Sequence, residues 1–238
     1  MKWLSNASVD ELADTLIRNY MGDQADKSFI VDIDGFVVDY LKLPLVYQAF
    51  AEKDTTTLGF ISDGTTPLNV SVNHKKQPKV FPKGTIVIEK CLKTEFESGR
   101  RRFTVAHEAA HYIVDKSLTV ASFHREFDKE KTYTPDTLKS LFNIKETNVD
   151  RLAGALLMPR FMVHRYLLQN DRSDGITLYD NGFIRPEDNA FLQRMAANMG
   201  ASVTAMQIRL MQLGLYLRKS INEYVTELGL GKEATDLE

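Results

Sequence analysis

Three residues in the segment FTVAHEAAHYIV, at positions 103–114, have the types and spacing of a catalytic metal site. Residues four apart share one face of an α-helix, so His107 and His111 can both reach Zn²⁺ at about 2.0–2.1 Å. Glu108 lies about 100° around the helix from His107, too far to share the metal but close enough to touch a metal-bound water. Zinc lowers the pKa of that water towards about 7, so an adjacent carboxylate can accept its proton. The motif predicts metal-assisted hydrolysis with Glu108 as the base, although a surface helix can carry the same pattern by chance.

A catalytic zinc ion generally has three protein ligands and one open position, so a further ligand must come from another segment. Cys91, the only cysteine, stands alone in a strand-like stretch and is a poor candidate. The other candidates are His124, His164 and the acidic residues of the segment that ends at Pro159.

Glu146 and Asp150 are four residues apart, so on a helix they share a face. The opposite side of that helix carries apolar residues, namely Leu152, Ala153, Leu156 and Leu157. Glu146 has the reach to bind the metal. Asp150, one turn on, can accept a hydrogen bond from the far nitrogen of a ligating histidine and fix its tautomer. An acidic pair at this spacing is otherwise typical of a solvated helix face, and the histidine motif is what favours a metal site.

The composition is that of a soluble globular protein. Of 238 residues, 43% are hydrophobic and 26% charged, enough for one large domain or two modest ones. The net charge of −2 and the pI of about 6.2 give no global field that favours nucleic acid or an anionic membrane. No segment approaches the roughly 20 apolar residues of a membrane span, and the N-terminus lacks the apolar part of a signal peptide. With a single cysteine there is no disulfide framework, so we expect a cytoplasmic protein without membrane association.

The N-terminal part of the chain combines one helix with strand-like segments. The predicted elements, in order, are an amphipathic helix over residues 8–21, a β-hairpin over 27–41, a strand within 55–62, a loop at 73–84 and a strand within 84–90. The helix prediction uses Ser8 and Glu11 as a capping box. The hairpin prediction uses the Asp34-Gly35 pair as its turn.

The C-terminal part is mainly helical. The predicted elements are a helix over residues 99–116, a loop or short helices at 119–136, a helix that ends at Pro159, a helix over 159–169, a loop at 170–182 and a helix–turn–helix from Pro186 to about Lys219. The last ten residues are predicted to fray.

The two candidate metal-binding segments together resemble one known family. RRFTVAHEAAHYIV followed by ETNVDRLAGALLMP is similar to the ImmA/IrrE family of metallo-endopeptidases. Members typically show Arg-Phe-Thr-(Leu/Val)-Ala-His-Glu-x-x-His and, later, Glu-x-x-Ala-(Asn/Asp)-x-Phe-Ala-x-x-Leu-Leu-Met-Pro. The first helix, the LGFI strand and RLMQLGL near the end extend the likeness over most of the chain. Val149 and Leu152 depart from the usual alanine and phenylalanine, and Glu146 follows His111 at the long separation of 35 residues.

The resemblance implies a role for each matching residue. His107 and His111 match the zinc ligands, Glu108 the catalytic base and Glu146 the third ligand. Asp150 matches the Asn/Asp position, which implies an aspartate that supports a ligand histidine, and it is the alternative ligand should Glu146 not bind. The implied cofactor is one Zn²⁺ per chain, with Mn²⁺ as the alternative.

The resemblance also implies an α+β fold with a zincin-like metallopeptidase core, in which a small mixed or antiparallel sheet supports the active-site helices. We expect this core in residues 1–170 and a helical, helix-turn-helix-like region packed on it in residues 171–238. The implied activity is zinc-dependent hydrolysis of a peptide bond in a specific protein, a helix-turn-helix transcriptional repressor or antitoxin.

Several side chains remain candidates for accessory roles. The oxyanion-stabilising residue is not singled out among His124, His164, Tyr133 and Tyr112, while His74 in a lysine-rich loop is expected to be solvated. The strand within residues 55–62 could be the sheet edge that an extended substrate joins, or an ordinary interior strand.

The helix-turn-helix pattern near the C-terminus raises an alternative, a DNA-binding or protein-binding regulator whose metal site is structural or inactive. Charge argues against DNA, because residues 190–238 contain five basic and five acidic residues. The second helix of the pair carries only one basic residue, Arg209, whereas phosphate contacts need several. We therefore favour packing on the core or docking of the substrate over direct DNA binding.

Overall fold

A mixed four-stranded sheet supports the predicted site in the computed structural model, which describes residues 5–54, 56–114, 122–125 and 144–228. Its strands, in spatial order, are β1 (Leu45–Gln48), β5 (Ile86–Glu89), β2 (Thr57–Ile61) and β6 (Ser122–Arg125). β1 runs parallel to β5, while β2 runs antiparallel to both β5 and β6. The sheet is therefore mixed, as predicted, and the strands expected within residues 55–62 and 84–90 are confirmed.

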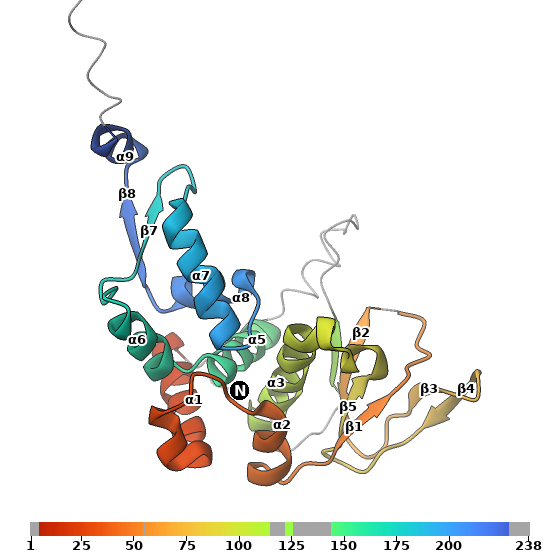
Figure 1. Cartoon of the computed structure of the whole chain (residues 1–238). Coiled ribbons are helices and arrows are strands. Elements are labelled where there is room, and N and C mark those ends of the chain that lie inside the picture. The colour runs from red at the N-terminus through yellow and green to blue at the C-terminus, as the bar shows by residue number, and fades with distance from the viewer. Residues whose placement is uncertain (1–4, 55, 115–121, 126–143, 229–238) are drawn as a thin grey trace, which may run out of the picture.

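The two faces of this sheet are covered by different elements. Helix α3 (Ser98–Val114) packs on one face, where Ile86 and Ile88 of β5 join the main core. Val87 points the other way, as alternation along a strand requires, and packs in a smaller core. A two-stranded hairpin, β3 (Leu68–Val72) and β4 (Lys75–Lys79), supplies Leu68 and Val70 to that smaller core. Figure 1 shows the hairpin at the outer end of the sheet, away from the helices.

The helices lie on the α3 side of the sheet (Figure 1). The longer ones besides α3 are α1 (Asn6–Met21), α5 (Ile144–Leu157), α6 (Arg160–Gln169), α7 (Pro186–Asn198) and α8 (Val203–Gln212). The short elements are η1 (Gly22–Asp26), α2 (Ile33–Gly35), η2 (Phe36–Tyr40), η3 (Lys90–Lys93), η4 (Glu95–Glu97) and α9 (Ile221–Glu227). α5 packs between α3 and α1, and α8 packs on α5 and α7. This arrangement confirms the α+β class and the helices predicted over residues 99–116, before Pro159 and over 159–169. It also confirms a pair of helices after Pro186, although the predicted end at about Lys219 is too late.

The β-hairpin predicted over residues 27–41 is wrong. These residues form the short helix α2 followed by the π-helical turn η2. Asp32 begins α2 as its N-cap, because its carboxylate accepts a hydrogen bond from the Gly35 N–H at 3.1 Å. Ile33, Phe36 and Val37 are buried at the i, i+3, i+4 spacing of a helix. The Asp-Gly pair therefore lies inside a helical segment rather than at a hairpin turn.

Smaller corrections concern the ends of elements and short strands. α1 begins at Asn6, and its cap is Ser5, whose hydroxyl accepts a hydrogen bond from the Ser8 N–H at 3.1 Å. β4 occupies the segment predicted as a loop, and β6 lies in the stretch expected to be a loop or short helices. β7 (Ile176–Tyr179) lies in the other predicted loop and pairs in parallel with β8 (Tyr216–Lys219), so the second helix of the predicted pair ends well before Lys219. β4 is itself wholly exposed, and β6, β7 and β8 pair with strands distant in sequence, so local apolar spacing does not reveal these strands.

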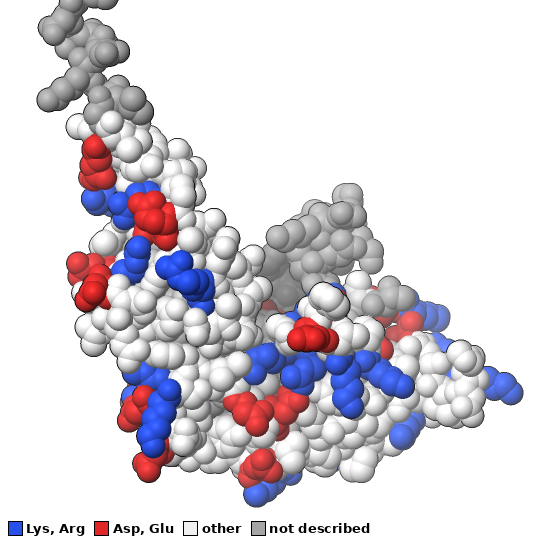
Figure 2. Space-filling view, in the orientation of Figure 1, with Lys and Arg blue, Asp and Glu red and all other residues white. Residues whose placement is uncertain are grey.

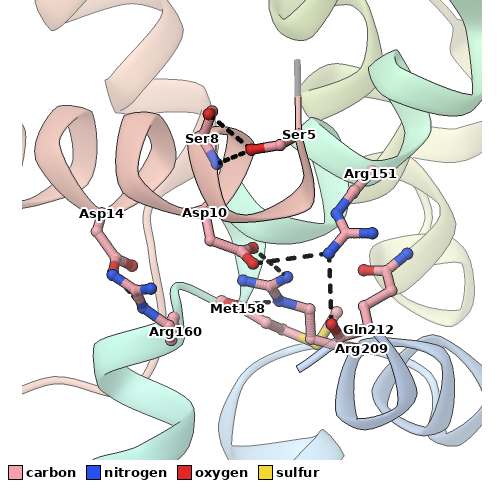
Figure 3. A network of polar contacts seen from close by, with 9 residues as sticks. All are labelled: Ser5, Ser8, Asp10, Asp14, Arg151, Met158, Arg160, Arg209 and Gln212. Carbon is pink, nitrogen blue, oxygen red and sulfur yellow. Dashed lines mark hydrogen bonds and ion pairs between the residues drawn. The ribbon is translucent and has the colours of Figure 1, made fainter. Parts of the chain in front are cut away.

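A buried ion cluster joins α1, α5 and α8 (Figure 3). The Arg209 guanidinium on α8, only 1% exposed, donates to the Asp10 carboxylate on α1 at 2.6 Å. It also donates through Nε to the backbone oxygen of Met158, just past the end of α5, at 2.9 Å. Arg151, from the middle of α5, lies 3.7 Å from the second oxygen of Asp10 and donates to the backbone oxygen of Gln212 at 3.3 Å. One aspartate thus fixes two arginines and holds three helices together.

Replacing Asp10 by asparagine should therefore destabilise the fold strongly. The substitution leaves the buried charge of Arg209 without a counter-charge, and removing one partner of a buried pair costs about 3–5 kcal/mol. We expect that loss in the free energy of unfolding measured by urea titration. The control is Glu227→Gln, because Glu227 pairs with Lys219 at 3.5 Å on the surface and such a pair contributes about 1 kcal/mol or less. Equal small losses for the two variants would contradict a structural role for the cluster.

Candidate metal centre

Packing of α5 on α3 brings together the three residues predicted as metal ligands. His107 and His111 lie one turn apart on α3, and their Nε2 atoms are 3.0 Å from each other. Glu146, in the first turn of α5, places Oε2 at 3.6 Å from His107 Nε2 and 3.3 Å from His111 Nε2. Among the described residues, these three form the one group of His, Cys, Asp or Glu side chains that lie close enough together to share a metal ion.

Asp150 lies behind His107 rather than in the group of three. Its Oδ1 is 2.9 Å from His107 Nδ1, so the imidazole can donate its Nδ1–H to this carboxylate. The Nε2 lone pair of His107 then points towards His111 and Glu146. A carboxylate at the nitrogen that does not bind metal fixes the tautomer of a metal-binding histidine. Asp150 thus contacts the far nitrogen of His107, while Glu146 lies next to the Nε2 atoms of both histidines.

The charges around the two histidines favour a cation between them. Burial disfavours the charged form of His107, but hydrogen bonds to Asp150 and Glu146 outweigh burial and raise its pKa to about 9. Burial likewise disfavours the carboxylate form of Glu146, yet hydrogen bonds from His107 and His111 hold its pKa well below the usual range. A proton and a metal ion compete for the same nitrogen atoms, so a cluster that attracts protons this strongly also attracts a divalent cation.

The carboxylate of Glu108 is not one of the three clustered donor groups, but it lies near enough to His107 to help raise the pKa of that imidazole. Glu108 follows His107 on α3 but turns towards strand β2, where its Oε1 lies against Gly59. The side chain is fully buried. The sequence pattern identified Glu108 but missed Gly59. A lone glycine inside a strand, as in TTTLGFIS, signals a close approach of another group and could have identified it.

The remaining histidines do not join this group within the described residues. His164 is exposed on α6, and His74 is exposed at the turn between β3 and β4. The backbone of His124 pairs with Gly59 in the sheet, but its side chain lies outside the described residues. His164 is therefore not placed as the third ligand.

The other accessory predictions have mixed outcomes. Tyr112 is partly buried against the main core, Tyr133 lies outside the described residues, and Cys91 is exposed. Strand β2 lies between β5 and β6, so the hypothesis that it forms the sheet edge is wrong, and its alternative, an interior strand, is correct.

Comparison with known protein families identifies the relatives of this chain. The family model described as the IrrE N-terminal-like domain, of peptidase family M78, matches residues 46–211, more than two thirds of the sequence. The chain belongs to this family. The match confirms the resemblance indicated by the histidine and glutamate segments and makes the chain a member of a metallopeptidase family. No curated protein matches the sequence. None of the helices in the described parts of this M78 family member is long and apolar enough to cross a lipid bilayer.

Membership of a metallopeptidase family implies a metal, and the three donor atoms fit one. Four ligands about 2.0–2.1 Å from Zn²⁺ at tetrahedral angles lie about 3.3–3.4 Å from each other. The donors of His107, His111 and Glu146 are separated by 3.0, 3.3 and 3.6 Å, which brackets that value. Two imidazole nitrogens and one carboxylate oxygen are also a set that zinc accepts in catalytic sites.

Metal binding should distinguish the roles of the two acids on α5. Glu146→Ala removes a donor atom, so we expect the purified protein to lose its bound zinc, measured by elemental analysis after dialysis. Asp150→Ala keeps all three donors and should weaken zinc affinity by about 10–100-fold. His164→Ala, which alters an exposed histidine of α6, is the control and should retain one equivalent. Zinc retained by Glu146→Ala but lost from Asp150→Ala would exchange the two roles.

Proposed function

We propose that this chain is a zinc-dependent endopeptidase that hydrolyses one peptide bond in a specific protein substrate. The observation that carries the proposal is the meeting of His107, His111 and Glu146 at donor distances of 3.0–3.6 Å, with Glu108 next to the first histidine. Bound between these side chains, a zinc ion would polarise the scissile carbonyl and acidify a water molecule. His107, His111 and Glu146 would hold it, and Asp150 would orient His107.

Glu108 would move the proton in this reaction. Its carboxylate would accept a proton from the attacking water, whose oxygen forms a bond to the carbonyl carbon of the substrate. As the carbon–nitrogen bond breaks, Glu108 would return that proton to the leaving amine, so the carboxylate is regenerated. Burial of Glu108 between α3 and β2 supports this role, because a buried carboxylate interacts more strongly with a nearby proton donor than a solvated one.

A helix-turn-helix repressor or antitoxin is the substrate class that the family resemblance supports. An extended substrate segment would pair with the sheet through its backbone. Within the described residues β1 and β6 are the two edge strands of the sheet. We propose β6 for this pairing because it neighbours β2, the strand whose Gly59 lies against Glu108. We place this activity in the cytoplasm, the reducing compartment expected for a chain with one cysteine.

The buried position of Arg209 argues against the alternative of a DNA-binding regulator. Arg209 is the one basic residue of α8, the helix that would enter a DNA groove, and it is bonded to Asp10 inside the protein. The exposed apolar residues of the same helix are Ile208 and Met211, which suit a protein partner better than a phosphate backbone. Figure 2 shows acidic and basic side chains interspersed over the C-terminal part on this face, with no continuous basic band there.

Glu108→Gln should retain zinc and lose activity. The amide keeps the size of the side chain but cannot accept a proton, and a positioned general base contributes about 10²–10⁴-fold to rate. Substrates can be found by labelling new protein N-termini in cells that express either the wild type or Glu108→Gln. We expect termini within a helix-turn-helix regulator in the wild type alone, reproduced with the purified regulator. Undiminished cleavage by Glu108→Gln at equal zinc content would remove Glu108 from the mechanism.

Removal of the metal should stop cleavage and lower thermal stability, because an ion that binds only the folded chain stabilises it. We expect 1,10-phenanthroline to abolish cleavage of the same regulator and to lower the Tm. One equivalent of Zn²⁺ should restore both, and Mn²⁺ is tested beside it because it is the alternative metal. Full activity in the chelated, zinc-free protein would contradict a metallopeptidase mechanism.

A further inference from the structure

Gly59, in the interior strand β2, lies unusually close to the carboxylate of Glu108. A Cβ atom built on Gly59 would be 2.6 Å from Glu108 Oε1 and 2.7 Å from the Cγ2 methyl of Thr104. Real Cβ atoms essentially never approach another heavy atom within 3.0 Å, so any larger residue forces a neighbour to move. The glycine is required by this lack of space and not by its backbone, because its φ lies outside the left-handed region.

The two neighbours of Gly59 differ in their freedom to move. Thr104 is buried, and its hydroxyl donates to the backbone oxygen of Arg100 at 3.0 Å, which fixes the position of its methyl group. Glu108 is also fully buried, so its carboxylate cannot turn out into solvent. A methyl group at position 59 would therefore push the Glu108 carboxylate to another place within the site.

An irregularity in the pairing of β2 with β6 also indicates that Gly59 helps to position Glu108. Its register shifts between Thr57 and Gly59, an irregularity of the kind that re-aims strand residues beside active sites. Gly59 follows this shift directly and faces α3, the helix of the two histidines. The strand thus brings bare backbone, rather than a side chain, against the base.

We infer that Gly59 is a positioning residue for the general base: its missing side chain creates the place in which the Glu108 carboxylate is held beside the metal ligands. The inference rests on the proposed function, because it concerns the base of that site. If the inference is correct, strand β2 as well as helix α3 determines where the Glu108 carboxylate lies.

The first test needs no substrate and uses the full chain. Gly59→Ala should lower the Tm by several degrees, because it overpacks a buried contact. In a Glu108→Ala background, where the carboxylate is absent, the same substitution should lower the Tm by less than half as much. Gly154→Ala is the control, because a Cβ atom on this buried α5 glycine meets no atom within 4 Å, and it should not lower the Tm. Equal losses of Tm in both backgrounds would overturn the inference.

The second test separates positioning from simple packing. Thr104→Ser removes the crowded methyl group but keeps the hydroxyl that donates to the backbone oxygen of Arg100. Because the clash with Glu108 remains, Gly59→Ala/Thr104→Ser should regain less than half of the lost Tm. Its zinc content should equal that of the wild type, while kcat on the regulator found by N-terminal labelling stays at least tenfold lower at similar KM. Recovery of kcat together with the Tm would mean that Gly59 only makes room for Thr104 and would overturn the inference. Normal cleavage by Glu108→Gln would refute the proposed function instead, and the Tm comparison would still stand.

Discussion

The contact between α3 and α5 is the constraint on which the site depends. Neither helix holds three donor atoms by itself, because α3 provides two imidazoles and α5 provides one carboxylate. Small residues of both helices, including Ala110 on α3 and Ala153 on α5, are fully buried in their shared core, and small side chains let helices approach closely. A helix shifted by one turn along its axis moves its side chains by about 5.4 Å, more than any donor separation here. The three donor atoms therefore come together in only one register of the two helices.

Two kinds of interaction hold that register. Apolar burial presses α5 between α3 and α1, but hydrophobic contact has little directional preference and tolerates sliding. The ion cluster is directional: Arg151 reaches Asp10 from the middle of α5, and Arg209 bonds the backbone at Met158, just past its end. Arg151 directly follows Asp150, so the ion cluster fixes α5 next to the residue that contacts His107. The N-terminal and C-terminal helices thus contribute to the site without touching it.

Features of the fold and the site that depend on neighbouring residues could be predicted from sequence, and features that depend on residues far apart in the chain could not. The helix of His107 and His111 was predictable because its apolar residues and its chemistry repeat within one segment. Glu146 as third ligand required the family resemblance, since nothing local relates it to a helix 35 residues earlier. β4 and β7 could not be predicted, because the first is wholly exposed and the second pairs with a strand about 40 residues away. The hairpin expected at Asp34-Gly35 is wrong for another reason: Ile33, Phe36 and Val37 have helical spacing, and their burial outweighs the local turn preference of Asp-Gly.

The C-terminal helices show that the shape of a motif and its chemistry can separate. α7 and α8 have the order and tight connection of a helix-turn-helix, yet the one basic side chain of α8 is directed inwards to Asp10. A recognition helix needs exposed basic side chains to contact DNA phosphates, and a basic side chain buried in the core cannot make such contacts. The large apolar side chains that α8 exposes to solvent are Ile208 and Met211. The inner side of this region therefore holds α5, the helix of Glu146, in place through Arg209 and the backbone of Gln212.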